Sequence, residues 1–232
     1  MRITSDIYEL LPDDSILKAV DADELAALLE FGVTRRFSPR QTVFEEGDDG
    51  DSMMIVLSGR LKVSVMSIGG KETLLDYIDK GNIAGEVAML DGGPRAATVS
   101  AVERTDVMIL HRRDLLPWLA QHTDAALKII QTLCGRLRTT NALVQDQATL
   151  AMAPRLAKGL LRMLDSHGDR EPDGSVKLRM SQSELGNYVA LSRENVNRQL
   201  RLWSEEGLVV LTRGAIRVTN LEPLEDIADE WD

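Results

Sequence analysis

Short runs of β-type residues separated by glycines constrain the fold of this chain most strongly. Between Phe37 and Leu110 the glycines at 47, 59, 69–70 and 81 divide the sequence at intervals of about ten to twelve residues. Apolar and β-branched segments lie between them, at 42–44, 52–57, 60–65, 72–78 and 107–110. This rhythm predicts an antiparallel roll or barrel with tight turns.

One stretch interrupts the rhythm, Gly-Glu-Val-Ala-Met-Leu-Asp-Gly-Gly-Pro-Arg-Ala-Ala-Thr-Val at 85–99. It opens with Gly85 and Glu86, and after a short apolar turn it presents Arg95 beside two alanines. An arginine fork pairs with a phosphate through charge-assisted bonds, and a fixed carboxylate accepts from a ribose hydroxyl. Small residues let backbone N–H groups approach the phosphate closely. The stretch therefore predicts a pocket for a sugar-phosphate.

These residues resemble the phosphate-binding cassette of cyclic-nucleotide-binding domains, which carries Gly-Glu and Pro-Arg-Ala-Ala-Thr-Val runs. The resemblance implies that Glu86 takes the ribose 2′-hydroxyl and Arg95 the cyclic phosphate. The expected ligand-binding residues of the cassette are Gly85, Glu86, Val87, Arg95, Ala96 and Ala97. The alternative, a surface ion pair between Glu86 and Arg95, explains neither the glycines nor the alanines, since exposed pairs contribute little.

Other classes of site lack the residues they need. His111, His122 and His167 are not paired at metal-ligand spacing, which disfavours a metal-dependent roll of the cupin type. The sequence shows neither a nucleophile with its base nor a Gly-Lys-Ser/Thr phosphate loop. We therefore expect no enzyme, no catalytic residue and no metal.

The compartment is predicted from what the sequence lacks. Cys134 is the only cysteine, so one chain holds no internal disulfide and no all-cysteine iron–sulfur cluster. There is no run of eighteen apolar residues and no charged-then-apolar leader. These features predict a cytoplasmic protein without a membrane partner.

Charge is unevenly divided along the chain, whose net charge is −10. Residues 1–151 carry 16 basic and 23 acidic side chains, whereas 152–220 carry 11 basic and 8 acidic ones. The last twelve residues add six acids and no base. Because DNA binding depends on local charge facing the phosphates, residues 152–220 are the candidate DNA-binding segment.

A long helix is predicted at about 124–150, and its seam residues, apolar except for Asn141, alternate steps of three and four. The positions are Leu127, Ile130, Cys134, Leu137, Asn141, Val144 and Ala148. Such an a/d seam sustained for three heptads suits a two-stranded coiled coil, so we expect a homodimer in which Cys134 is a small apolar seam residue. Asn141 on such a seam can fix register and oligomeric state.

A helix-turn-helix and a wing are predicted after Pro154, which interrupts the helical pattern. Ser181 opens a capping box with Glu184, and Ser192 is placed to cap a second helix at 193–205. Two short β-type runs, 208–212 and 216–219, then form a hairpin. We therefore expect three parts: 1–121 as the β-roll with flanking helices, 122–151 as the dimerisation helix and hinge, and 152–232 as the winged helix-turn-helix with an acidic tail.

The run from Ser192 to Arg198 resembles the recognition helix of the cyclic-AMP receptor branch of the Crp/Fnr family. The resemblance implies that Arg193, Glu194 and Arg198 read bases, since arginine pairs with guanine and glutamate accepts from cytosine N4. A palindrome of TGTGA-like half-sites is implied. Asn197 departs from the small residue usual there. The expected DNA-binding residues are Ser181, Gln182, Ser192, Arg193, Glu194, Asn197, Arg198 and Arg201. The same branch implies that Thr140 and Asn141 of the dimer helix contact the adenine.

Together these features predict an α+β chain: a double-stranded β-roll of the cyclic-nucleotide-binding fold, a long dimerisation helix and a winged helix-turn-helix. The expected function is a homodimeric transcription regulator whose cyclic nucleotide gates binding to double-stranded DNA. Cyclic AMP (cAMP) is preferred over cyclic GMP (cGMP), because Ala96 offers no hydroxyl to the guanine amino group. RNA polymerase is a further expected partner. The main alternative is an effector-independent regulator whose β-roll is only a dimerisation scaffold, and the presence of both Glu86 and Arg95 argues against it. A nucleotide sensor that acts through a protein partner without DNA is disfavoured by Arg193, Glu194 and Arg198. The first twenty residues and the acidic tail lie outside both resemblances.

Overall fold

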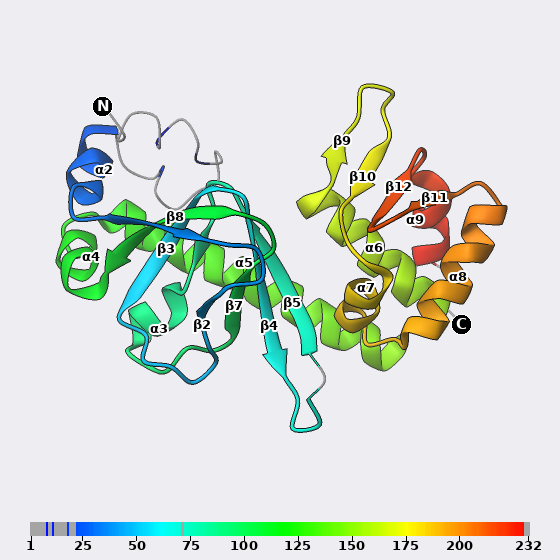
Figure 1. Cartoon of the computed structure of the whole chain (residues 1–232), viewed down its shortest axis with the longest axis horizontal. Coiled ribbons are helices and arrows are strands. Elements are labelled where there is room, and N and C mark those ends of the chain that lie inside the picture. Colours follow the sequence, from blue (N-terminus) through cyan, green and yellow to red (C-terminus); the bar gives the residue numbers. More distant parts are fainter. Residues whose placement is uncertain (1–7, 9–10, 12–17, 19–21, 71, 230–232) are drawn as a thin grey trace. The chain divides into compact units, whose positions relative to one another are not determined.

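The computed structural model describes residues 8, 11, 18, 22–70 and 72–229, which form two compact units (Figure 1). The first unit comprises 1–65 and 75–136, and the second comprises 66–74 and 137–232. The division falls inside a helix, α5 (Thr123–Thr149), so the boundaries expected at 121 and 151 remain predictions. Most of the first 21 residues and the last three lie outside the described part of the chain.

Two four-stranded antiparallel sheets form the first unit's roll. One sheet has the order β1 (Val33–Phe37), β8 (Thr105–His111), β3 (Ser52–Ser58), β6 (Ile83–Ala84). The other has the order β2 (Thr42–Phe44), β7 (Thr98–Ala101), β4 (Arg60–Met66), β5 (Glu72–Asp79). The predicted double-stranded β-roll is confirmed, and the five predicted β-type runs all lie in strands. β1, β6 and β7 are strands that the sequence pattern did not predict.

β3 is buried on both faces, which explains its unbroken apolar sequence. Met54 and Val56 belong to a core cluster shared by the two sheets. Met53 and Ile55 point the other way, into a cluster shared with the helices. Because successive side chains of a strand point to opposite faces, β3 contributes alternate residues to each of the two core clusters.

Helices cover the outer face of the sheet that contains β3. They are α2 (Ala22–Leu29), α3 (Glu86–Asp91), α4 (Arg112–Leu119) and the start of α5. In α2 the buried side chains are Leu25, Leu28 and Leu29, an i, i+3, i+4 stripe. This stripe packs α2 against the sheet.

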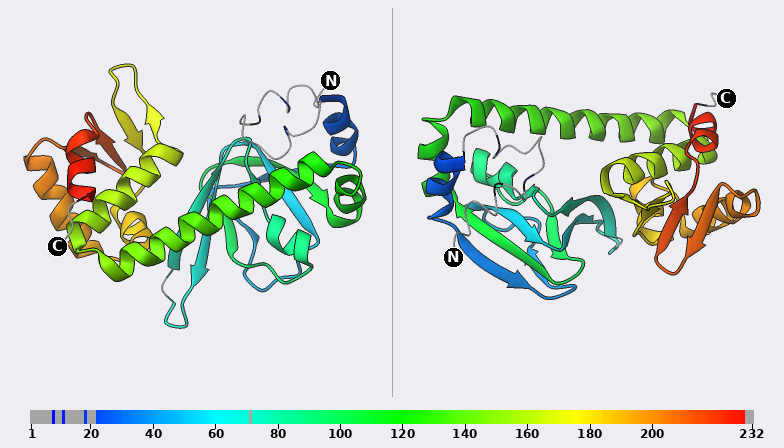
Figure 2. Two further views of the ribbon diagram at one scale, coloured as in Figure 1. Left: turned by 180° about the vertical axis from the view of Figure 1, so that it is seen from behind. Right: turned by 90° about the horizontal axis from the view of Figure 1, so that it is seen from above.

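In the second unit, the end of α5 is bound by the helix that follows it, α6 (Met152–His167). Asp146 of α5 is only 8% exposed and forms ion pairs with Arg162 and Lys158 of α6. Arg155 Nη1 also donates to the Gln147 carbonyl over 3.1 Å. Figure 2 shows α5 as one unbroken helix, as predicted. The turn into α6 is thus held by charged contacts.

The remaining elements of the second unit form a winged helix-turn-helix. They are β9 (Asp169–Arg170), β10 (Val176–Leu178), α7 (Gln182–Tyr188), α8 (Arg193–Glu205), β11 (Val209–Thr212), β12 (Ala215–Val218) and α9 (Glu222–Ala228). The sheet order is β11-β12-β10-β9. Val196, Leu200 and Trp203 of α8 are buried and lie on one face of the helix at i, i+4, i+7 spacing.

The expectation that the chain ends in an acidic tail outside the winged helix-turn-helix is corrected by the structure. Residues 222–228 form α9, which packs on α6 and buries Leu224 and Ala228. These two residues are four apart and lie on one helical face. The tail therefore contains part of the folded domain.

Candidate functional site

The cassette 85–99 forms a loop built around the short helix α3. Gly85 precedes α3 with φ 81°, and Gly92 follows it with φ 77°. Both values lie in the left-handed region that favours glycine. A Cβ atom on Gly85 would lie 2.6 Å from Arg95 Nη1 and 3.2 Å from the Ser52 carbonyl oxygen. Gly85 is therefore required both for its conformation and for the approach of Arg95.

Arg95 is a buried residue of the cassette and is only 5% exposed. Its Nη1 donates to the carbonyl oxygens of Ser52 (2.7 Å) and Gly85 (3.0 Å), and its Nη2 donates to Ser52 Oγ (3.1 Å). The guanidinium carbon lies 4.2 Å from the centre of the Phe44 ring. Arg95 Nε is buried without a hydrogen-bond partner in the described part of the chain. The arginine is thus fixed in place while its Nε keeps an unused donor for a ligand.

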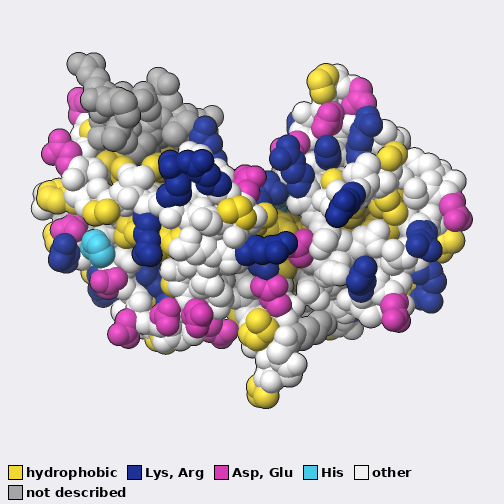
Figure 3. All heavy atoms as spheres, in the orientation of Figure 1, with side chains coloured by type: hydrophobic (Ala, Val, Ile, Leu, Met, Phe, Trp, Pro, Cys, Tyr) yellow, Lys and Arg dark blue, Asp and Glu magenta, His cyan; other side chains and the backbone are white. Residues whose placement is uncertain are grey.

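The loop at 45–51 surrounds Arg95 with carboxylates. The backbone N–H of Arg95 donates to the Asp48 carbonyl over 2.8 Å. Burial lowers the pKa of Arg95, whereas the charges of Asp51, Asp48 and Glu86 act in the opposite direction. Figure 3 shows acidic side chains along the edge of the first unit where β2 lies. An anionic ligand here must rely on local donors, because the surroundings are negative.

Glu86 is 2% exposed and is paired with an arginine that the sequence analysis missed. Arg136 of α5 donates to Glu86 Oε1, and its Nη2 donates to the Ile83 carbonyl over 3.3 Å. Arg136 lies between the seam residues Cys134 and Leu137, and the sequence analysis considered only the apolar seam of this helix. The sequence feature that could have identified Arg136 is a basic residue on the helical face opposite the seam. The candidate ribose ligand is thus tied to α5.

The other predicted ligand residues differ in exposure. Val87 and Ala96 are exposed, whereas Ala97, two residues after Arg95, is buried. Thr140 and Asn141 are exposed on α5 in the second unit, so their contact with a base remains a prediction.

The predicted seam of α5 is exposed in the single chain. Leu127, Ile130, Leu137 and Val144 are 52–61% exposed, and Cys134 is exposed as well. Ala148 is exposed too. A row of apolar side chains in water is costly, and such rows are typical of surfaces that bind partners.

Both caps of the helix-turn-helix form as predicted. Ser181 and Glu184 make the reciprocal capping box of α7, at 3.1 Å and 2.9 Å. Ser192 Oγ accepts from the Asn195 N–H over 3.2 Å at the start of α8. These bonds satisfy N–H groups that a helix start leaves unpaired. The turn and the recognition helix are therefore fixed by their own sequence.

Four of the predicted DNA-binding residues, among them the base readers Arg193, Glu194 and Arg198, lie on the open face of α8. Arg193, Glu194, Arg198 and Arg201 are exposed. Asn197 is half-buried and bonds to Gln182 instead, over 2.6 Å. Figure 3 shows Lys and Arg side chains over α8 and over β9 and β10. This face suits the phosphates and base edges of a duplex.

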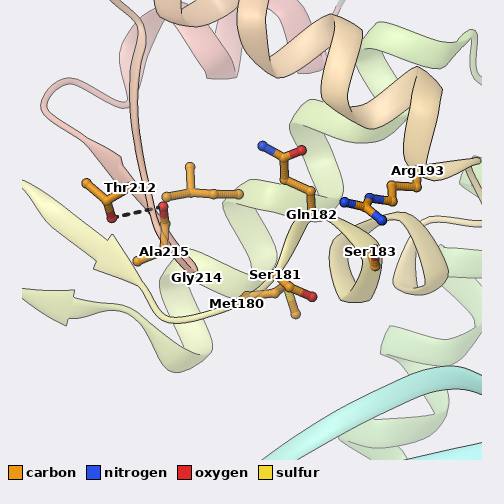
Figure 4. Close-up of a pocket in the computed structure, with 9 residues that line it drawn as sticks. Met180, Ser181, Gln182, Ser183, Arg193, Thr212, Gly214 and Ala215 are labelled. Atoms are coloured by element: carbon orange, nitrogen blue, oxygen red, sulfur yellow. Dashed lines mark hydrogen bonds between the residues drawn. The ribbon is translucent and has the colours of Figure 1, made fainter.

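A pocket of about 180 Å³ lies between the start of α7, the start of α8 and the wing (Figure 4). Its lining residues are Met180, Ser181, Gln182, Ser183, Arg193, Thr212, Gly214, Ala215 and Ile216. In Figure 4 the Arg193 side chain extends toward Gln182. The structure thus brings together three predicted DNA-binding residues, Ser181, Gln182 and Arg193.

Two family models match the two parts of this geometry. The cyclic nucleotide-binding domain matches residues 34–122, and the Crp-like helix-turn-helix domain matches 154–227. The chain is 30% identical to the cyclic AMP receptor protein of Thermus thermophilus over 206 residues, covering 89% of this chain and 93% of that protein. The chain belongs to the Crp/Fnr family of transcription regulators.

Other Crp/Fnr members agree with this assignment. A CRP-like cAMP-activated global transcriptional regulator of Mycobacterium tuberculosis is 28% identical over 218 residues, covering 93% of this chain and 97% of that protein. FixK2 of Bradyrhizobium japonicum shares the fold, with a TM-score of 0.75 at 19% identity over 87% of this chain and 99% of that one. FixK2 shows the fold alone, whereas the M. tuberculosis relative is named a transcriptional regulator. Together with the Crp-like helix-turn-helix match, that relative identifies this Crp/Fnr chain as a DNA-binding regulator and not an enzyme.

The family match also extends further than the sequence resemblance indicated, because the helix-turn-helix model continues to residue 227 and so includes most of α9. Among the described residues, no helix is long and apolar enough to cross a membrane. The same part of the chain holds no group of three or more metal-ligating side chains.

Proposed function

We propose that this Crp/Fnr regulator is a homodimer that binds a cyclic nucleotide, with cAMP preferred over cGMP, and that the nucleotide gates binding to a palindromic TGTGA-like site. One observation carries the ligand part: Arg95 is almost fully buried yet keeps an unpartnered Nε, beside the buried carboxylate of Glu86. A buried donor without a partner costs free energy, and a cyclic phosphate would satisfy it.

The choice of cAMP draws on the relatives. The regulator from M. tuberculosis is named as cAMP-activated, and the protein from T. thermophilus is named a cyclic AMP receptor. In this chain the ribose 2′-hydroxyl would donate to Glu86, and the phosphate would accept from Arg95. Thr140 and Asn141 would complete the site from the dimer helix.

The ion pair between Glu86 and Arg136 offers a route by which nucleotide binding in the cassette affects α5. A ribose hydroxyl that donates to Glu86 shares the carboxylate with Arg136, which belongs to α5. The nucleotide can shift the regulator between two arrangements only through different affinities for them. A change in the Glu86 contact supplies such a difference on the helix that carries the dimer seam.

The exposed seam supports the homodimer. Its a/d spacing fits a second copy of α5, and in that pairing the apolar side chains at 127, 130, 137 and 144 leave water. Two recognition helices related by a two-fold axis then match a palindrome with half-sites about one helical turn apart. RNA polymerase is the further partner expected of such a regulator.

The testing experiment is calorimetric titration of the purified protein with cAMP and then cGMP, for the wild type, Arg95→Gln and the control Arg113→Ala. Arg113 is 82% exposed and lies outside the cassette. We expect micromolar binding in the wild type and control and its loss in Arg95→Gln. Melting curves check that the variant is folded, and Glu86→Gln is a second variant that keeps Arg95.

Fluorescence anisotropy with a TGTGA palindrome then compares DNA affinity with and without nucleotide. Tighter binding with cAMP supports gating. Heat from neither nucleotide, together with full DNA affinity in their absence, would contradict the gating proposal.

That contrary result would favour a scaffold role for the β-roll. One observation is compatible with it: Glu86 already pairs with Arg136, and Arg95 already bonds to Ser52 and Gly85. Their polar groups are mostly satisfied within the chain, so the roll can be stable without a ligand. Only Arg95 Nε argues directly against this reading.

A further inference from the structure

A hydrogen bond between two amide side chains joins the recognition helix to the first turn of α7. Asn197 Nδ2 donates to Gln182 Oε1 over 2.6 Å. Both side chains are half-buried. The bond therefore fixes the orientation of each amide relative to the other.

The bond decides what Gln182 can offer to a ligand. An amide has one oxygen acceptor and one NH₂ group with two donors. With its oxygen occupied by Asn197, Gln182 has its NH₂ group available. Within the described residues no group accepts a hydrogen bond from it. Gln182 is thus presented as a donor.

The pocket beside Gln182 is lined by further donors. Ser181 and Ser183 contribute hydroxyls, and Arg193 contributes a guanidinium from α8 (Figure 4). No carboxylate is among the nine lining residues. A donor-rich pocket without acids suits a phosphate oxygen of a DNA backbone.

Asn197 itself is poorly placed to read a base. The contact by which asparagine recognises adenine uses both the oxygen and the NH₂ group of one amide. The Asn197 amide is half-buried against Gln182, whereas Arg193, Glu194 and Arg198 are exposed. Turning it into the groove would break a short hydrogen bond.

We infer that Asn197 is a positioning residue: it holds Gln182 so that the glutamine NH₂ donates to one backbone phosphate per half-site, and it reads no base. The inference rests on the proposed binding to a palindrome. The contact between Gln182 and the phosphate would then be independent of DNA sequence, because a phosphate carries no sequence information.

The test uses the full protein with saturating cAMP and a set of TGTGA duplexes, each with one methylphosphonate in place of a phosphate. We expect one position per half-site where the replacement weakens the wild type about fivefold, the worth of one net hydrogen bond. Gln182→Ala should be insensitive to replacement at that position. Asn197→Ala should lose most of the same sensitivity.

Two further measurements separate positioning from base reading. Asn197→Ala should keep the wild-type preference for TGTGA over duplexes with single base changes. In a protein that already carries Gln182→Ala, it should cause no further loss of DNA affinity. Asn197→Asp should weaken binding more than Asn197→Ala, because a carboxylate attracts the glutamine NH₂ and turns Oε1 toward the phosphate. Gln199→Glu on the same helix controls for the added charge.

The inference is overturned if Asn197→Ala keeps the phosphate sensitivity, or if it changes the preference at a single base pair. A wild type that binds no TGTGA duplex overturns the proposed function as well, and this result is visible before any variant is compared.

Discussion

Replacing Gly85 by alanine tests the geometry of the cassette most directly. The new Cβ would lie 2.6 Å from Arg95 Nη1, closer than Cβ atoms approach other atoms, at a backbone φ of 81°. The left-handed conformation costs about 1–2 kcal/mol for a residue with a side chain. The collision also displaces Nη1 from its two carbonyl acceptors, and one lost charge-assisted bond costs about 2 kcal/mol.

Gly70→Ala is the matched control. Gly70 has φ 77°, but no atom lies within 4 Å of a Cβ built there. Both variants share the backbone cost, so the excess of about 2 kcal/mol in Gly85→Ala measures the displaced arginine. For a chain of this length the excess corresponds to about 6 °C in melting temperature.

The assays are differential scanning calorimetry without ligand and titration with cAMP. A charge-assisted bond from Arg95 to the phosphate is also worth about 2 kcal/mol, so its loss predicts a Kd for cAMP about 30-fold higher in Gly85→Ala than in Gly70→Ala. Equal melting temperatures and equal affinities of the two variants would refute the argued contact between Gly85 and Arg95. Lower stability with unchanged affinity would show that Arg95 does not bind the phosphate.

Three further predictions concern charge and assembly. Arg136→Ala should lower the free energy of unfolding in urea by about 2 kcal/mol, less than the loss of a fully buried pair, because the Arg136 side chain is 40% exposed. Adding Glu86→Gln to this variant should recover part of the lost stability. An Arg136→Ala variant as stable as wild type would contradict the pairing. A mild oxidant should link two chains through Cys134 at the seam, as seen on non-reducing gels, and Cys134→Ser should abolish the link; a dimer that never crosslinks would argue against a parallel seam. Hydrogen bonds from Ser175 lower the pKa of Asp173, so its charged form stabilises the fold above the unfolded pKa of about 3.9, and this contribution is lost as the pH falls through the lower folded pKa. Asp173→Asn should therefore melt below wild type at pH 7, and the two should converge in acid; a constant gap down to about pH 2 would refute this assignment.

The sequence predicted those elements whose own residues determine them. The apolar run of β3 and the caps at Ser181 and Ser192 are local patterns, and each appears in the structure as expected. β1 was missed because four of its five residues are exposed and two are arginines. It is a strand because its backbone pairs with β8, and no local pattern records that pairing.

The site shows the same division. Arg95 and Glu86 were found because a contiguous motif carries them. Arg136 lies 50 residues from Glu86, and Asn197 lies 15 residues from Gln182, so both contacts depend on packing between separate elements. The burial of Leu224 and Ala228 in α9 was likewise hidden by the acidic composition of the tail.

The ion pair of Glu86 with Arg136 also sets a threshold for the proposed sensor. Any free energy needed to loosen this pair is subtracted from the affinity of the nucleotide, and each 1.4 kcal/mol raises the half-saturating concentration about tenfold. Residues outside the pocket that strengthen or weaken Arg136 would therefore change the nucleotide concentration at which the regulator responds. Relatives with identical cassettes could in this way answer to different intracellular levels of one signal.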